Sequence, residues 1–306
     1  MVKKNNPHLL IVGGTGFIGY HLALRAIKKK WKVTSISLNK PRNYRYINEV
    51  NYIKTDISNL NKTKKKLVGS FTYVVNLSGY VKHFLFKGKI DIIIKTHFLG
   101  LINLIKILSK KKIKKFVQIG TSAEYGNIKS PQKEDVYGQP NSSYGIAKLA
   151  STKLLLSLYN TKKFPVSVLR FFQIYGPKQD ENRVLPQIIN GCLKDKKFAA
   201  SSGQQIRDFC YIDDAVNAIF LALSSKKSAG EIINIGSGRP FKIKKIIKQI
   251  QKKIGKGTVQ FGKIKYRKDE SMKLYPDITK AKKKLKWKPK VSFNKGINIT
   301  INSYKI

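Results

Sequence analysis

The 306-residue sequence predicts an α/β fold, in which a doubly wound parallel sheet is followed by a smaller α+β lobe. Short apolar runs alternate with segments of helical period through the first half, and repeated strand–helix units of this kind form parallel sheets. A glycine-rich stretch, Gly13-Gly14-Thr15-Gly16-Phe17-Ile18-Gly19, joins the first apolar run to the first helical segment. Both features place the sheet at the start of the chain.

The glycine-rich stretch predicts that the chain binds a dinucleotide. Glycines let the backbone turn tightly and approach a pyrophosphate closely, and the following helix offers unpaired N–H groups and the positive end of its dipole. A plain turn is the alternative, but the strand before and the helix after favour the dinucleotide. The residues expected to hold the cofactor here are Gly13, Thr15, Gly16, Phe17, Ile18 and Gly19.

The other strands of the first half are expected where apolar or β-branched residues cluster, and the helices where apolar residues recur at helical spacing. The strands are predicted at 9–12, 32–38, 51–54, 71–77, 115–120 and 166–171. The helices are predicted at 18–30, 89–110 and 143–159. The run 71–77 is continuously apolar, which is typical of a strand buried on both faces.

The second half is less regular. Helices are predicted at 182–192, 213–223 and 242–254, and a strand at 231–235. We therefore divide the chain into a Rossmann-type dinucleotide-binding domain, residues 1–170, and a lobe that mainly binds the substrate, residues 171–306. Residues 207–236 are expected to return to the first domain.

The formal net charge of +46 raises the question of a polyanionic partner. A basic stripe or tail binds nucleic acid or an anionic membrane. Here the lysines are spread over the whole chain, so we attribute the charge to compositional bias and expect neither nucleic acid nor membrane as a partner. The remaining functional interpretation is that the charge attracts an anionic substrate.

The composition, which is 42% hydrophobic, is that of a globular protein. No apolar run reaches the length of a membrane span. Lys3 and Lys4 precede the apolar run 9–12, but this run is too short for a signal peptide and we interpret it as the first strand. Cys192 and Cys210 have neither disulfide-framework nor metal-ligand spacing. We therefore expect a cytoplasmic protein without a metal.

The pattern Tyr-x-x-x-Lys occurs three times, beginning at Tyr125, Tyr144 and Tyr159. On a helix this spacing puts both side chains on one face, where the ammonium can stabilise a tyrosinate and lower the pKa of the phenol. Such a tyrosine gives or takes a proton at a sugar hydroxyl or carbonyl while hydride moves to or from a nicotinamide. Local sequence favours the pair Tyr144 and Lys148, because a helix start precedes it and helix-forming residues follow. A structural helix tyrosine is the alternative.

Thr121 follows the predicted strand 115–120. Its hydroxyl is therefore expected at the C-terminal edge of the sheet, where ligands of open α/β sheets bind. A residue that only caps the turn is the alternative interpretation.

These residues resemble the motifs of the extended short-chain dehydrogenases/reductases, in the nucleotide-sugar epimerase/dehydratase family. The resemblance covers essentially the whole chain. Further matching motifs are Thr55-Asp56-Ile57, Val75-Asn76-Leu77-Ser78, Leu169-Arg170, Tyr175-Gly176-Pro177, Arg207-Asp208-Phe209, Tyr211-Ile212-Asp213-Asp214, Asn234-Ile235-Gly236-Ser237-Gly238 and Trp287-Lys288-Pro289.

The resemblance implies a role for several residues. Tyr144 is the acid/base, Lys148 also holds the nicotinamide ribose, and Thr121 hydrogen-bonds the reacting sugar oxygen. The cofactor is further contacted by Asp56, Ile57, Leu77 and Ser78. The substrate is bound by Ser122, Gln173, Arg207 and Arg267. The two arginines are expected to pair with the diphosphate of a nucleoside-diphosphate sugar, which an arginine fork suits.

The end of the second strand departs from the family pattern. NAD-using members have an acidic residue there, whereas this chain has Ser37-Leu38-Asn39-Lys40, followed by Arg42. A basic loop without an acidic residue suits the 2′-phosphate of NADP. We therefore favour NADP(H) over NAD(H) and assign Ser37, Asn39, Lys40 and Arg42 to the cofactor.

Three further departures concern the reaction. Sugar 4,6-dehydratases carry an acidic residue at the position of Ala123, and Glu124 would point elsewhere in an extended segment. Dehydration is therefore disfavoured. His97 and Gln173 each replace an asparagine usual in the family, and we interpret His97 as a buried polar group of the long helix.

The resemblance to subfamilies favours reduction at C4. Residues 121–126 resemble GDP-4-keto-6-deoxymannose reductases, and the carboxyl half resembles CDP-3,6-dideoxyhexose synthases. The main hypothesis is a 4-keto-6-deoxyhexose reductase; the alternative is an NAD-dependent 4-epimerase of the UDP-glucose 4-epimerase type, which shares the same catalytic residues. A dehydratase and a non-catalytic NAD(P)-binding protein are less favoured. The resemblance also implies a homodimer formed through helices 89–110 and 143–159.

Overall fold

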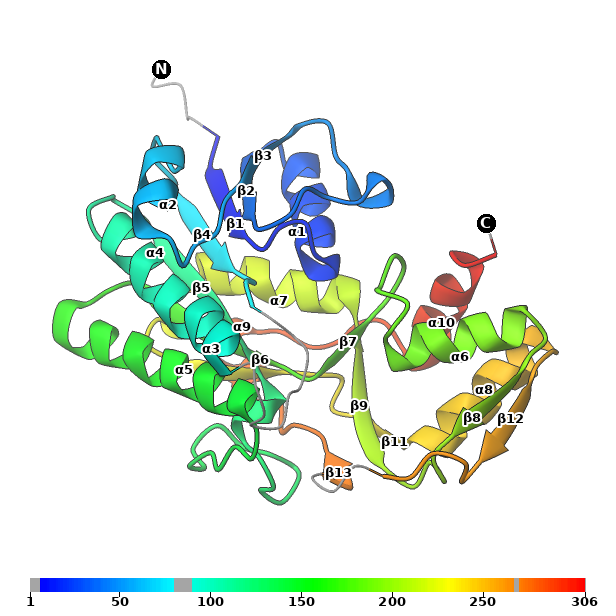
Figure 1. Ribbon diagram of the computed structural model, residues 1–306. Coiled ribbons are helices and arrows are strands. Elements are labelled where there is room, and N and C mark those ends of the chain that lie inside the picture. The colour runs from blue at the N-terminus through cyan, green and yellow to red at the C-terminus, as the bar shows by residue number, and fades with distance from the viewer. Residues whose placement is uncertain (1–5, 80–89, 267–269, 306) are drawn as a thin grey trace.

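The computed structural model describes residues 6–79, 90–266 and 270–305. Its main feature is a seven-stranded parallel sheet with the order β10-β6-β5-β4-β1-β2-β3 (Figure 1). The strands are β1 (His8–Val12), β2 (Lys32–Ser37), β3 (Val50–Lys54), β4 (Tyr73–Asn76), β5 (Lys115–Thr121), β6 (Val166–Phe171) and β10 (Ile232–Ile235). The predicted doubly wound parallel sheet is confirmed.

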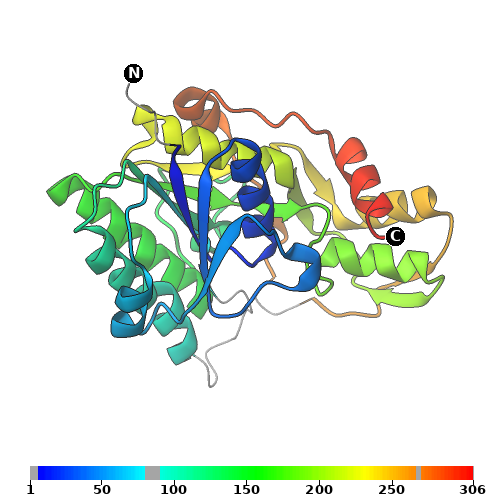
Figure 2. The same ribbon diagram turned by 90° about the horizontal axis from the view of Figure 1, so that it is seen from above.

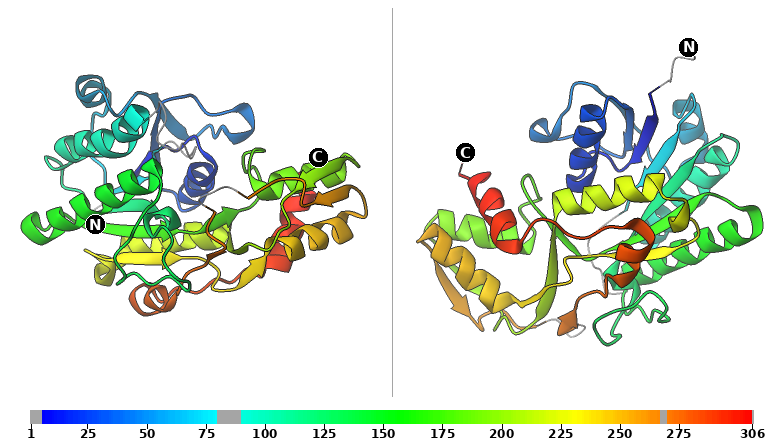
Figure 3. Two further views of the ribbon diagram at one scale, coloured as in Figure 1. Left: turned by 60° about the horizontal axis from the view of Figure 1, so that its bottom comes forward. Right: turned by 180° about the vertical axis from the view of Figure 1, so that it is seen from behind.

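Helices cover both faces of this sheet, because the strands are apolar on both sides. In β1, Leu9 and Ile11 belong to one core cluster and Leu10 and Val12 to another. Helices α1 (Phe17–Lys28) and α7 (Ile212–Ser224) lie together on the first face, while α2 (Leu60–Lys66), α4 (Gly100–Leu108) and α5 (Ser143–Lys162) cover the second (Figure 3). The chain order reverses between β1 and β4, which is where such sheets bind ligands.

The helix predicted at 89–110 is not uniform. Its described part comprises α3 (Ile90–Ile94), a π-helical turn η2 (Lys95–Leu99) and α4. A π turn inserts one residue into the helical repeat and changes the direction in which the following side chains point; such turns are frequent at functional sites. Hydrophobic periodicity alone does not reveal an insertion of this kind.

A smaller group of elements lies beside the parallel sheet. Strands β7 (Gln173–Tyr175), β9 (Ile206–Tyr211), β11 (Pro240–Lys242) and β13 (Lys273–Leu274) form one small sheet, and β8 (Lys197–Ala200) pairs with β12 (Thr258–Phe261). Figure 2 shows α6 (Val184–Leu193), α8 (Ile243–Ile254) and α10 (Phe293–Asn302) gathered at this end. The remaining elements are α9 (Thr279–Leu285) and the short turns η1 (Asn43–Arg45), η3 (Ser122–Glu124) and η4 (Lys226–Ser228).

The second half contains more elements than the sequence predicts. Two-residue to six-residue strands such as β13 and β9 carry little periodic signal, and the lysine-rich α2 and α9 have few apolar residues. Helix α7 and strand β10 return to the parallel sheet. We keep the division near residue 170 as a proposal.

The motif that contains Trp287 fastens the C-terminal segment to α7. The indole Nε1 donates to the backbone oxygen of Asp214 at 3.0 Å. The carboxylate of Asp214 accepts from the backbone N–H groups of Lys290 and Val291, each at 2.9 Å. Burial raises the pKa of this carboxyl group, and the two N–H donors oppose the shift.

Among the described residues, no helix combines the length and apolar character needed to cross a bilayer.

Candidate active site

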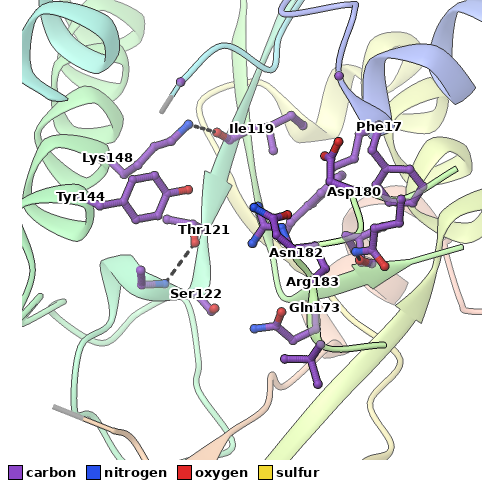
Figure 4. A pocket seen from close by; sticks show the side chains of 18 of the residues that line it. Phe17, Ile119, Thr121, Ser122, Tyr144, Lys148, Gln173, Asp180, Asn182 and Arg183 are labelled. Carbon is purple, nitrogen blue, oxygen red and sulfur yellow. Dashed lines mark hydrogen bonds between the residues drawn. The ribbon is translucent and has the colours of Figure 1, made fainter. Parts of the chain in front are cut away.

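A cavity of about 1320 Å³ lies at the carboxyl ends of β1, β4 and β5 and extends to the smaller lobe. Figure 4 shows Tyr144, Lys148 and Thr121 on one side of it, with Phe17, Asp180 and Arg183 on the other. Residues of β5 and α5 therefore face residues of α1 and of the segment between β7 and α6 across one cavity. The cavity is lined by most of the residues that the sequence predicts for the site.

The glycine-rich loop forms the floor of the cavity at the start of α1. Gly13 has φ +82°, and a Cβ there would come 3.0 Å from the backbone of Leu77 and Ser78. Gly19 packs on Gly14, because a Cβ added to Gly19 would lie 2.5 Å from the Cα atom of Gly14. No side chain of the described residues caps the N-terminus of α1, so its first N–H groups can serve an anion. Gly13, Thr15, Gly16, Phe17, Ile18 and Gly19 all line the cavity.

Beside the glycine-rich loop, Ser37 at the end of β2 and Asn39 after it also line the cavity. The Ser37 hydroxyl accepts from the backbone N–H of Thr15 at 3.3 Å. Lys40 instead lines an adjoining hollow of about 430 Å³, together with Asn39. Of the four residues assigned to the cofactor from the segment after β2, the structure therefore places Ser37 and Asn39 on the cavity and Lys40 on the adjoining hollow.

Arg42 is the exception among these four residues, because it does not line either space. Its side chain is 64% exposed, donates to the Tyr44 hydroxyl at 2.9 Å and lies 3.8 Å from the carboxylate of Asp180. Arg45, which is buried, donates to the same carboxylate at 3.0 Å and to the Lys178 carbonyl. The loop after β2 is thus tied to the loop after β7.

The adenine and nicotinamide regions predicted from the motifs also lie on the cavity. Asp56, Ile57, Leu77 and Ser78 line it. The Asp56 carboxylate accepts from the backbone N–H of Ser58 at 2.9 Å. The Ser78 hydroxyl donates to Asn76 at 2.6 Å, which fixes the end of β4.

Thr121 stands at the end of β5, where the chain enters the turn η3. Its hydroxyl accepts from the backbone N–H of Ala123 at 3.2 Å. In return, the Glu124 carboxylate accepts from the Thr121 N–H at 2.8 Å. This is a capping box, which holds both residues in one conformation. Ser122 follows on the cavity wall.

Tyr144 and Lys148 project from the first turns of α5. Ser142 caps the helix by accepting from the Gly145 N–H at 3.2 Å. Lys148 Nζ donates to the Ile119 carbonyl at 2.9 Å, so its ammonium is anchored to β5. Both side chains line the cavity, yet only 7% of Tyr144 and 5% of Lys148 are exposed.

This burial shifts the pKa of both groups. Burial raises the pKa of Tyr144 to about 12, and the hydrogen bond with Thr121 and the charge of Arg183 oppose this shift. Burial lowers the pKa of Lys148 to about 8, against the carboxylate of Glu124. Burial therefore favours the neutral form of each member of the pair.

The other two Tyr-x-x-x-Lys patterns lie elsewhere. The Tyr125 hydroxyl donates to Asn234 in β10 at 2.8 Å, and the ring is fully buried. Tyr159 lies near the end of α5, and neither tyrosine lines the cavity. The structure thus brings only the Tyr144 pair to the cavity.

Glu124 lies beneath the site and not on its wall. Its carboxylate is fully buried and accepts from Arg170 Nε at 2.9 Å and from the Thr152 hydroxyl at 2.8 Å. Arg170 is also buried, with its guanidinium carbon 4.5 Å from the centroid of the Tyr125 ring. The ion pair thus joins η3 to β6, and hydrogen bonds from Thr152 and from the Thr121 N–H connect the same carboxylate to α5 and β5.

Two of the four residues predicted for the substrate lie towards the smaller lobe. Gln173 and Arg207 line the cavity there. Arg207 is buried, donates to the Ile206 carbonyl at 2.9 Å and forms an ion pair with Glu270. A carboxylate of the chain therefore already neutralises the arginine that was predicted to meet a diphosphate. Arg267 lies outside the described residues.

Several polar residues that line the cavity carry no binding role predicted from the sequence, and four of them lie close to the predicted site. They are His97, Asp180, Asn182 and Arg183. Asp180, Asn182 and Arg183 follow the Tyr175-Gly176-Pro177 motif, which could have marked this loop. For His97 the sequence predicts a buried polar group of the long helix, and the structure places it both in that helix and on the cavity wall.

Comparison with known proteins supports the resemblance inferred from the sequence. Residues 9–236 match the model of the NAD dependent epimerase/dehydratase family. A curated relative, UDP-N-acetyl-alpha-D-glucosaminuronate decarboxylase of Bacillus cytotoxicus, is 32% identical over 97% of this chain and 97% of its own length.

Solved structures resemble the whole chain. UDP-glucose 4-epimerase of Thermotoga maritima, solved with UDP-glucose, has a TM-score of 0.90 and 26% identity, covering 97% of this chain and 98% of its own. UDP-glucuronic acid 4-epimerase of Bacillus cereus, solved with UDP-glucuronic acid and NAD, has a TM-score of 0.88 and 29% identity, covering 97% and 99%.

Replacing Glu124 by Gln should destabilise the protein, because Arg170 would remain buried without a charged partner. We expect a loss of about 3 kcal/mol in the free energy of unfolding, measured by urea denaturation. The control Thr152→Val removes one hydrogen bond to the same carboxylate and should cost about 1 kcal/mol. Equal losses in the two variants would contradict a special cost of the unpaired arginine.

Replacing Lys148 by Met should stabilise the protein at pH 7. The pKa of about 8 in the folded state lies below the ordinary value of 10.5, so folding at pH 7 includes the cost of burying the ammonium. This cost disappears between about pH 8 and 10.5, because there the unfolded chain binds the proton and the folded chain does not. The variant should gain up to about 3 kcal/mol at pH 7. The gain should shrink as the pH of the denaturation experiment rises, and a gain independent of pH would contradict the explanation.

Proposed function

Because the chain belongs to the NAD-dependent epimerase/dehydratase family, we propose that it is an NAD-dependent 4-epimerase of a uridine-diphosphate sugar. The observation that carries this proposal is the grouping of Thr121, Tyr144 and Lys148 on the wall of a cavity that begins at the glycine-rich loop. The family match and the two 4-epimerase structures support the same class of reaction. They favour it over the 4-keto reductase that the motifs alone suggest.

The residues present fit a dinucleotide. The backbone of Gly13 approaches Leu77 and Ser78 too closely for a side chain, and the start of α1 offers N–H groups to a pyrophosphate. NAD held by these residues would supply the acceptor, and then the donor, of the hydride exchanged at C4 of the sugar.

The chain's own residues handle the proton. Tyr144 takes the proton of the sugar 4-hydroxyl as hydride leaves C4. It returns this proton to O4 after the 4-keto sugar has rotated and presents its other face to the hydride. Thr121 hydrogen-bonds the same oxygen, and the Lys148 ammonium favours the phenolate. No net proton or electron is consumed, so Tyr144 and the cofactor return to their starting states at the end of each turnover.

The cofactor that we propose is NAD(H). The uronate epimerase structure above contains NAD, which supports this choice over the NADP(H) favoured by the sequence. Lys40 and the hollow beside Asn39 are the features that would suit a 2′-phosphate. Assays with both cofactors distinguish the two.

A second candidate reaction is decarboxylation of a UDP-uronic acid after oxidation at C4. The 32% identical relative is a decarboxylase of UDP-N-acetyl-alpha-D-glucosaminuronate. The specific feature in its favour is Arg183, a cation on the cavity wall whose charge acts on Tyr144. A guanidinium suits a carboxylate at C6 of the sugar.

We also keep the cytoplasmic location as a proposal.

Replacing Tyr144 by Phe should abolish most activity, because the phenol that exchanges the proton is lost. Purified protein is incubated with NAD or NADP and with UDP-glucose, UDP-glucuronate or a 4-keto-6-deoxy sugar nucleotide, and products are identified by NMR. We expect inversion at C4 with NAD and a loss of about 100- to 10,000-fold in kcat for the variant.

The matched control is Tyr159→Phe, which alters the second Tyr-x-x-x-Lys pattern beginning on the same helix, outside the cavity. It should retain wild-type activity. Release of carbon dioxide from the uronate would establish the second candidate. Oxidation of NADPH by the keto sugar, without any inversion of UDP-sugars, would restore the reductase.

We also propose a homodimer through α3, η2 and α5. Large apolar side chains are exposed on these elements: Ile92, Ile94, Leu99 and Ile146. Ile146→Lys should weaken the dimer measured by sedimentation equilibrium by at least tenfold in Kd, because it would bury a charge. The control Val68→Lys alters a more exposed residue outside these helices. A wild-type protein that sediments as a monomer would refute the proposal.

A further inference from the structure

His97 is a buried imidazole on the cavity wall that the reaction proposed above does not use. It lies in the π-helical turn η2 and is 5% exposed. It lines the same cavity as Tyr144 and Lys148. A buried, polar and titratable ring in this position needs a physical explanation.

The imidazole contacts the ring of Tyr144. The two ring centroids are 5.2 Å apart and the planes meet at 73°, an edge-to-face arrangement. Aromatic pairs of this geometry restrict each other's orientation. His97 therefore defines one boundary of the space in which the phenol can turn.

The backbone around His97 is adapted to this ring. Gly79, at φ +146°, leaves no room for a side chain, since a Cβ there would lie 2.0 Å from His97 Cε1 and 2.5 Å from Nδ1. The His97 carbonyl accepts from the Ser151 hydroxyl at 2.9 Å, and the same hydroxyl donates to the Ala147 carbonyl at 2.8 Å. The π turn, α5 and the end of β4 together hold the imidazole against Tyr144.

The charges near this contact are few among the described residues. Lys95 of the same turn, Lys148 of α5 and Arg183 at the start of α6 line the cavity, and the charge of Arg183 acts on Tyr144. Ser78 and Gly79 at the end of β4 carry no charge. The Glu124 carboxylate lies beneath the site and is paired with Arg170. An imidazole has a polar N–H and gains a positive charge on protonation; both favour a neighbouring phenolate over a phenol.

We propose that His97 is a positioning residue for Tyr144, which orients the phenol ring and favours its phenolate form during proton transfer from the sugar. This rests on the acid/base role of Tyr144 in the proposed function. His97 itself neither gains nor loses a bond in this step. The proton passes only between the sugar O4 and the Tyr144 oxygen.

The test measures the titration of Tyr144 directly, without substrate. The ultraviolet absorbance of tyrosinate is followed against pH in the NAD-bound protein, and the same titration of Tyr144→Phe is subtracted. The measurement is repeated with His97→Leu, alone and combined with Tyr144→Phe. His97→Leu has a similar volume but no polar group. We expect it to raise the Tyr144 midpoint, measured as a tyrosinate fraction about tenfold lower than in the wild type at each pH below the wild-type midpoint.

His97→Asn restores a polar N–H and should return most of this shift. In the turnover assay, His97→Leu should lower kcat about tenfold at pH 7, leave KM for the UDP-sugar within twofold, and approach wild-type kcat at high pH. If the leucine variant does not bind NAD, His97→Met provides the same measurement with an unbranched side chain.

An unchanged tyrosinate midpoint in His97→Leu, or an equal loss of kcat at every pH, would overturn the proposal and leave His97 with a packing role only. Failure of asparagine to recover the midpoint would also overturn it. If the wild-type protein inverts no UDP-sugar, the proposed function fails, but the tyrosinate titration still decides the role of His97.

Discussion

The buried ion pair between Glu124 and Arg170 is the interaction on which the site depends. Removing two charges from water is costly, and such a pair is tolerated only where further hydrogen bonds satisfy it. The Glu124 carboxylate meets this condition through Arg170, Thr152 and the backbone N–H of Thr121. Because the last of these bonds reaches the cavity wall, the position of Thr121 is determined by the charge balance of the core.

The same core network extends beyond the reacting residues. Tyr125 lies over the Arg170 guanidinium and donates to Asn234, whose amide nitrogen in turn donates to the Gln132 carbonyl. The network thus connects β5, β6 and β10 with the segment after η3. Burial beside this network raises the pKa of Tyr144 to about 12 and lowers the pKa of Lys148 to about 8, so the charged form of each group is more costly here than in water. The site therefore stores an electrostatic cost, as is common where function competes with stability.

Local patterns in the sequence were sufficient to predict the parallel sheet, the glycine-rich loop and the Tyr144 pair. Each depends on residues that are neighbours along one strand, turn or helix. The role of Glu124 was also within reach, because Thr121 and Glu124 have the spacing of a capping box. An extended conformation, which the alternation of side chains after β5 suggests, is wrong for this segment, because it forms the turn η3.

Other features depend on contacts between distant segments and could not be predicted locally. Arg42 has the charge expected near a 2′-phosphate, but Asp180 and Tyr44 hold it outside the cavity. The contact of His97 with Tyr144 depends on a π turn that no periodicity reveals. Arg207 lies on the cavity as the motif predicts, but its ion pair with Glu270 required the fold.

The tie between Arg45 and the loop after β7 has a geometric consequence. Arg45 belongs to the segment that follows β2, at the adenosine end of the cavity, whereas Asp180 lines the cavity next to Asn182 and Arg183. One buried guanidinium thus acts as a spacer between two walls. Lys178 of the same loop also donates to the Tyr44 carbonyl, so a ligand bound at one end of the cavity meets a loop that is held in place from the other end.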